Sequence, residues 1–211
     1  MATIDESGLA AKIRDRPIND RLRRVLLAAA ANAGVDVVHV VSGGQPGSSG
    51  QRTGSNRHDG GNAADLELIA DGRTLDFTAQ SDLAAFCRFV AAAAASRATG
   101  IGAGVDYMGP TRLHVGFGNG PRDMAKVVWG AGGAAANAPA WLSEAAAYGW
   151  ANPAAATPGE AWPQQPPGGE VIGGPGKARA SSRRGRFRGC PASSSGTRNA
   201  PTESSACSGG P

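Results

Sequence analysis

Hydrophobic residues recur at helical spacing in three stretches of the chain, and we expect each stretch to form a helix. The stretches are residues 19–33, 81–98 and 138–150. Asn19 or Asp20 can cap the start of the first helix, and Gly34 is placed to end it. Ser81 can cap the second helix in the same way. The third helix can pack its apolar residues back on the domain.

Shorter β-branched or alternating runs lie between these helices and predict strands. They are residues 35–43, 63–70 and 73–77, followed by two strands within residues 101–118. Asp71-Gly72 separates the second run from the third and is a signal for a hairpin turn. A second turn, at Gly109-Pro110, is expected to join the last two strands.

The order of these elements predicts an α+β fold, with a small and mostly antiparallel sheet flanked by helices. Residues 43–61 form a long loop rich in Gly, Ser, Gln and Asn. Loops of this length inside a compact domain tend to be functional. We place one domain in residues 1–150.

The composition changes beyond residue 150, where nine of the 14 prolines lie among Ser, Gly and Arg. Few large apolar residues are present to offset the entropy cost of ordering, so we expect a disordered tail over residues 151–211. From Gly169 onward the chain has seven basic and two acidic residues, a net charge of +5, which leaves −1 for the rest. The basic balance therefore indicates no nucleic-acid face on the domain. The tail can contact anionic polymers, or it is a solvated or mistranslated extension.

The three cysteines do not form a disulfide framework. Cys87, in an apolar helical run, is expected to be a buried free thiol, whereas Cys190 and Cys207 could pair within the tail. The N-terminal residues are polar and lack the pattern of a secretory signal, and no apolar run is long enough to cross a membrane. These features favour a protein that is cytoplasmic as synthesised and is released by lysis or carried in a virion.

Candidate chemistry lies in GSNRHDGGNAADLEL, residues 54–68, where small residues separate His58 from Asp65. Hydrolytic zinc sites use about three His or carboxylate ligands and leave a position for water. A turn from the loop into the following strand can bring His58 and Asp65 to one point. Gly61 would let the backbone approach the ion closely, and Ala63 would leave space beside it.

A third ligand must come from one of the two remaining histidines. His39 lies within a valine-rich strand, where a hydrogen-bonded core histidine is the simpler interpretation. His114 lies in an alternating strand and shares one face with Arg112 and Gly116, so it is the candidate ligand. On pattern alone, the set with His114 is either a metal site or a group of unrelated core and surface residues.

The run HDGGNAAD, residues 58–65, resembles the H-x-x-G-x-A-x-D signature of the zinc D-alanyl-D-alanine carboxypeptidase and dipeptidase family. That family includes phage endolysins that cut the L-alanyl-D-glutamate bond, and its fold is similar to the Hedgehog signalling domain. All four defined positions match. The likeness extends loosely over residues 18–120, through VVSGG, QRTGSNRH and the later strand histidine.

The resemblance implies a zinc ion (Zn2+) held by His58, Asp65 and His114, and a peptidoglycan stem peptide as substrate. It also implies that Arg52 holds a substrate carboxylate or polarises the scissile carbonyl. Arginine suits the anionic end of such a peptide, because its planar fork can meet a carboxylate with two hydrogen bonds. Arg57 could take the same role, or it is an ordinary exposed arginine.

The chain departs from the family pattern in two places. Asn56 stands two residues before the first ligand, where the family often has serine. The family's general base is usually a glutamate shortly before the last histidine, or in related branches an aspartate two residues after it, where this chain has Gly116. The nearest carboxylate is Asp106, which we take as the candidate catalytic base, with an ordinary surface aspartate as the alternative. Loss of a general base typically costs about 10²–10⁴-fold in rate.

These observations lead to three functional hypotheses. The first is a zinc-dependent peptidase that cleaves peptidoglycan stem peptides with metal-activated water, as a carboxypeptidase or an endolysin. The second is a catalytically impaired module that keeps zinc and binds a peptide or the cell wall. The third is a phage structural protein. Nucleotide binding is not supported, because the glycine-rich runs lack the spacing of a dinucleotide fingerprint and the lysine of a phosphate loop.

Overall fold

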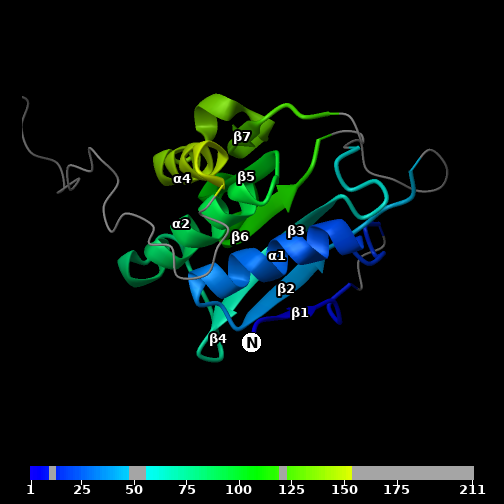
Figure 1. The fold of residues 1–211 in the computed structure, drawn as a ribbon, viewed down its shortest axis with the longest axis horizontal. Coiled ribbons are helices and arrows are strands. Elements are labelled where there is room, and N and C mark those ends of the chain that lie inside the picture. The colour runs from blue at the N-terminus through cyan, green and yellow to red at the C-terminus, as the bar shows by residue number, and fades with distance from the viewer. Residues whose placement is uncertain (10–12, 48–55, 119–122, 154–211) are drawn as a thin grey trace, which may run out of the picture. The chain divides into compact units, whose positions relative to one another are not determined.

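The computed structural model of the chain describes residues 1–9, 13–47, 56–118 and 123–153 (Figure 1). All of these residues belong to a unit that spans Met1–Gly169. The tail predicted for residues 151–211 lies outside the described residues, except for residues 151–153.

The described residues form an α+β structure around a seven-stranded mixed sheet (Figure 1). The strand order is β1-β2-β3-β6-β5-β7, and β4 pairs with β3. The strands in chain order are β1 (Thr3–Asp5), β2 (Val37–Ser42), β3 (Ala63–Ala70), β4 (Arg73–Thr74), β5 (Gly100–Gly104), β6 (Gly109–Gly116) and β7 (Val127–Trp129).

The expectation of a mostly antiparallel sheet is wrong, because the sheet is mixed. Both of its outer pairs, β1 with β2 and β5 with β7, are parallel, whereas the pairs that β3 and β6 make with their neighbours are antiparallel. A parallel pair needs a crossover connection, and helix α1 (Asp20–Ala33) supplies it between β1 and β2. The outer strands β1 and β7 are three residues long, too short for alternation to identify them in the sequence.

The core lies between one face of the sheet and the helices α1, α2 (Gln80–Ala95) and α4 (Ala140–Ala151) (Figure 1). Alternate residues of the central strands enter it, such as Leu66 and Leu68 of β3 and Leu113 of β6. No helix in the described part of the chain is long and apolar enough to cross a membrane. The remaining α-helix among the described residues is α3 (Val105–Met108), and two short 3-10 helices, η1 (Ala131–Gly133) and η2 (Ala135–Asn137), precede α4.

The structure confirms the predicted start and end of helix α1. The Asn19 side chain accepts a hydrogen bond from the Leu22 backbone N–H at 2.9 Å, and Gly34 ends the helix in a left-handed conformation with φ 71°. The expected cap of α2 is wrong. Ala79 is the N-cap residue, and Ser81 lies inside the helix.

The turn predictions have opposite outcomes. Asp71 and Gly72 both have positive φ and join β3 to β4 as the hairpin signal predicts. The turn expected at Gly109-Pro110 is wrong, because α3 makes the connection and β6 already begins at Gly109. The φ of 84° at Gly109 lets the chain leave α3 directly into the strand.

Cys87 is a buried free thiol on α2, as predicted, and burial raises the pKa of this thiol to about 11. We therefore expect it to react slowly with a thiol reagent at neutral pH, because the thiolate is the nucleophile. In a Cys190→Ser/Cys207→Ser variant, native labelling should be about 100-fold slower than labelling in denaturant. The two time courses measure this ratio directly, and similar rates in both states would contradict the burial.

Candidate metal centre

Asp65 and His114 stand opposite each other on the neighbouring strands β3 and β6. Their chain neighbours Leu66 and Leu113 point into the core. Because side chains alternate along a strand, Asp65 and His114 both point to the other face of the sheet, away from the helices. The register between the two strands therefore brings this carboxylate and this imidazole together.

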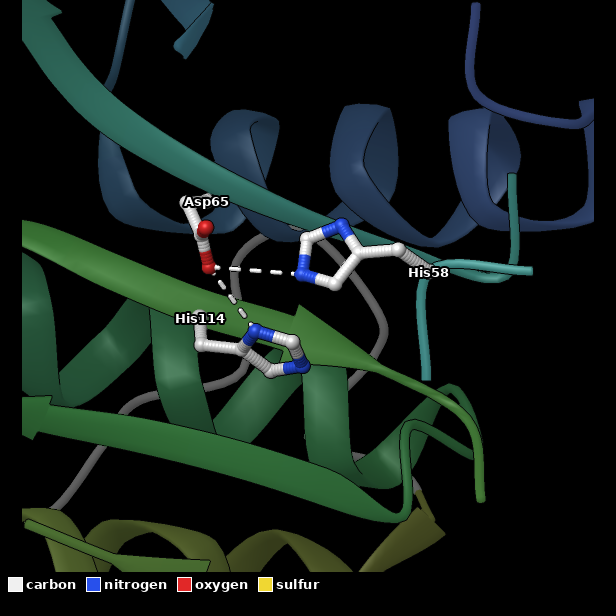
Figure 2. Close-up of side chains that lie close together, drawn as sticks. All are labelled: His58, Asp65 and His114. Atoms are coloured by element: carbon white, nitrogen blue, oxygen red, sulfur yellow. Dashed lines mark hydrogen bonds and ion pairs between the residues drawn. The ribbon is translucent and has the colours of Figure 1, made fainter. Parts of the chain in front are cut away.

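His58 reaches the same point from the loop that precedes β3, and its side chain is fully buried. Its Nδ1 donates a hydrogen bond to the Gly43 carbonyl oxygen at 2.7 Å, just after β2. A carbonyl accepts only, so Nδ1 carries a proton, and Nε2 is the ring nitrogen that can offer a lone pair to a metal ion. That Nε2 points towards Asp65, as Figure 2 shows.

One oxygen of the Asp65 carboxylate faces both imidazole rings (Figure 2). This Oδ1 is 3.6 Å from His58 Nε2 and accepts a hydrogen bond from His114 Nδ1 at 2.8 Å. The two ring centroids are 4.9 Å apart with the planes at 74°. Ligand atoms of all three residues lie within 4.8 Å of one another, so the group could hold a metal ion.

The protonation states of the group suit a cation. Burial disfavours the charge of Asp65, but the hydrogen bond from His114 and the nearby imidazole of His58 outweigh it and hold the pKa of that carboxyl well below its usual range. Burial also lowers the pKa of His114, despite the carboxylate beside it. The result is an ionised carboxylate and a neutral imidazole, the forms that coordinate metals.

Two buried ring nitrogens in this group lack a hydrogen bond. Neither His58 Nε2 nor His114 Nε2 has a hydrogen-bond partner among the described residues. An unsatisfied buried polar atom typically costs about 1–3 kcal/mol. A metal ion at this point would remove that cost for His58, whose Nε2 faces Asp65.

A cavity of about 220 Å³ lies beside the group. Its wall contains the stacked pair Arg57 and Trp129, with the guanidinium carbon 4.4 Å from the centre of the indole ring. That indole ring lies 4.9 Å from the ring of His114. The lining residues are Arg14, Arg57, His58, Tyr107, His114, Trp129 and Gly133.

Two glycines of β5 leave the space that this stacked pair occupies. A Cβ on Gly100 would be 2.6 Å from Arg57 Nη1, and a Cβ on Gly102 would be 2.5 Å from the indole of Trp129. In the sequence, this glycine-rich run predicts a strand and does not fit a dinucleotide fingerprint. Glycines two residues apart in a strand are the signal that was missed, because they mark the close approach of another group to that face.

The two predicted catalytic residues, Arg52 and Asp106, both stay predictions. Arg52 lies outside the described residues. Asp106 is exposed on α3 and next to Tyr107, which lines the cavity, but Asp106 is not among the described lining residues. Its role as a base therefore stays a prediction. Arg57, the alternative to Arg52, does line the cavity.

The sequence assigned Gly61 and Ala63 to the surroundings of the ion, and the structure gives Gly61 another role. Gly61 has φ 75°, and a Cβ there would be 2.6 Å from the Asn19 backbone nitrogen, so it packs against the start of α1. Ala63 is fully buried and lies opposite Gly116. A Cβ added to Gly116 would be 2.4 Å from the Cβ of Ala63. An aspartate at position 116 would therefore have no room.

His39 lies outside the group, as expected, but it is half-buried rather than part of the core. Its Nδ1 is 3.5 Å from Glu67 Oε2 on the neighbouring strand. Val38 and Val40 point into the core, so His39 between them points to the opposite face of the sheet, away from the helices. On that face its partner is Glu67.

Fold and site together define an α+β protein with a candidate metal centre on the face of a mixed sheet that points away from the helices. Comparisons with models of protein families, with curated proteins and with solved structures find no match. The chemistry of the site is therefore the basis for a functional proposal.

Proposed function

We propose that the protein is a zinc-dependent peptidase that cleaves peptidoglycan stem peptides. The observation that carries the proposal is the convergence of His58, Asp65 and His114 beside a cavity. Two imidazoles and one carboxylate are a donor set that zinc uses in hydrolases. Tetrahedral zinc with bonds of about 2.0–2.1 Å would place its ligand atoms about 3.3 Å apart, close to the spacings around Asp65. Zinc bound there would supply an acidified water and polarise the scissile carbonyl.

The cavity wall suits a small peptide that carries a carboxylate. The guanidinium of Arg57 is held on Trp129 at the wall, where it can meet a substrate carboxylate. Tyr107 and Trp129 add apolar surface. A volume of about 220 Å³ is below the range of about 300–1,000 Å³ typical of ligand pockets, which favours residues as small as alanine. The signature at residues 58–65 supports the same substrate class.

A second candidate function is a module that binds zinc and a wall peptide without turnover. The observation that favours it is that the described residues lining the cavity include no carboxylate. General acid–base catalysis needs a group within hydrogen-bond reach of the proton that moves. The proposed peptidase would have to take this group from Asp106 on α3 or from the residues outside the described part.

We expect His114→Ala to abolish hydrolysis of a stem pentapeptide that ends in D-alanyl-D-alanine. The purified full chain is incubated with zinc and peptide, and the products are measured by chromatography and mass spectrometry. His39→Ala is the matched control, because it removes an imidazole from the same face without touching the group. Wild-type protein that binds zinc and peptide but releases no product would favour the binding module.

Replacement of Asp106 tests the candidate base separately. If Asp106 moves the proton, Asp106→Ala should lower the turnover number by about 10²–10⁴-fold and leave zinc binding intact. Asp106→Asn keeps the size of the side chain and should lose as much, because an amide cannot accept the proton. Unchanged turnover in both variants would remove Asp106 from the reaction.

A further inference from the structure

Arg14 links two of the candidate ligands although it lies far from both in the sequence. It precedes α1 and is 51 positions away from Asp65. Its neighbour Arg16 forms a bridge with Gly44, which holds this segment against the chain just after β2. Arg14 also lines the cavity beside His58 and His114.

The side chain of Arg14 binds one oxygen of the candidate carboxylate ligand. Its Nη1 donates to Asp65 Oδ2 at 3.0 Å, and the other oxygen, Oδ1, faces the two imidazoles. Both partners are shielded, with side-chain exposures of 21% for Arg14 and 14% for Asp65. The two oxygens of Asp65 therefore have separate partners on separate sides.

The backbone of Arg14 leads to the second ligand. Its carbonyl oxygen accepts a hydrogen bond from the Gly43 N–H at 2.8 Å. The Gly43 carbonyl in turn accepts the bond from His58 Nδ1 at 2.7 Å. Arg14 has φ 65°, a left-handed conformation that a residue with a side chain rarely adopts. Such strain persists where the surroundings enforce it, and it clusters at functional sites.

We propose that Arg14 is a positioning residue that makes Asp65 present a single oxygen, Oδ1, to the bound metal ion. This inference rests on the proposed metal site. A carboxylate without a partner can offer both oxygens to a cation, but the guanidinium on Oδ2 competes for one of them. Mutation of a residue that hydrogen-bonds to a metal ligand commonly lowers metal affinity by about 10–100-fold. With Oδ2 engaged by Arg14, one coordination position stays available for water or substrate.

The test uses Co2+ as a probe on the full-length chain, because its visible absorption reports coordination number. We expect Arg14→Ala to weaken Co2+ binding by about 10–100-fold. We also expect its absorption to become weaker per bound ion, as when coordination number rises, since Asp65 can then use both oxygens. Arg14→Lys keeps a donor and a charge near Oδ2 and should restore part of both properties.

Arg16→Ala is the matched control, because Arg16 is exposed in the same segment and contributes its backbone to the bridge. It should bind and absorb as the wild type does. If Arg14→Ala does not fold, Arg14→Gln, similar in length and uncharged, decides the comparison. Wild-type affinity and spectrum in the folded variant would overturn the role of Arg14 alone. Failure of the wild-type chain to bind Co2+ would overturn the metal site and the proposed function with it.

Discussion

Replacing Asp65 with alanine should leave the protein without stoichiometric zinc. Asp65 is the only anionic member of the group, and its Oδ1 lies 2.8 Å and 3.6 Å from the two imidazoles. Without it, the positive charge of the Arg14 guanidinium would lie beside the candidate cation site with no carboxylate to offset it. We expect affinity to fall by more than about 100-fold, beyond the usual effect of a residue that only supports a ligand.

Zinc titration and thermal unfolding measure this loss. A ligand at about 100 times its dissociation constant stabilises a protein by about 2.7 kcal/mol. For a domain of this size that corresponds to a rise in melting temperature of roughly 5–10 °C. Wild-type protein should show the rise, and Asp65→Ala should not. Glu67→Ala is the control, because Glu67 is the next carboxylate on the same face of β3 and pairs with Arg112 instead. A zinc-dependent rise in Asp65→Ala equal to that of the wild type would rule out the assigned site.

The second large effect is expected in the core. Phe86 of α2 is fully buried and lies against Phe77 and Trp141, with ring centroids 5.5 Å and 6.0 Å away. Phe86→Ala should lower the free energy of unfolding by about 3–5 kcal/mol, because it leaves a cavity where α2 meets α4. That is a large share of the roughly 5–15 kcal/mol that stabilises a typical domain.

Urea unfolding followed by circular dichroism measures this loss. Leu83→Ala on the same helix is the control, since Leu83 is only half-buried and should cost less than half as much. Equal losses in the two variants would mean that the Phe86 ring is not central to the packing of α2 on α4.

The sequence identified helix α1 and the β3–β4 hairpin because their signals are local. A capping side chain at Asn19 acts on an amide three residues away, and Gly34 ends the helix through its own backbone conformation. Residues 71 and 72 turn the chain within two positions. The pairing of His58 with Asp65 was also open to prediction, since seven residues of loop and strand can return to one point.

The mixed sheet and the surroundings of the site depend on contacts that no local signal specifies. His114 lies opposite Asp65 because of the register between β3 and β6, although the two residues are 49 positions apart in the chain. The sequence identified both residues as candidate ligands but could not specify this register. The stack of Arg57 on Trp129 needs two glycines on a third strand, so it becomes visible only when β5 and β7 are side by side.

By itself, then, the sequence determined the helix periods, both ends of α1, the turn between β3 and β4, and which side chains were chemically fit to bind a cation, because each of these depends on neighbours within a few residues. Only the tertiary structure decided that Arg14 donates a hydrogen bond to Asp65, that the Gly43 carbonyl orients His58, and that the outer strands run parallel to their partners. The physical reason is that strand pairing and side-chain burial are set by the whole chain at once.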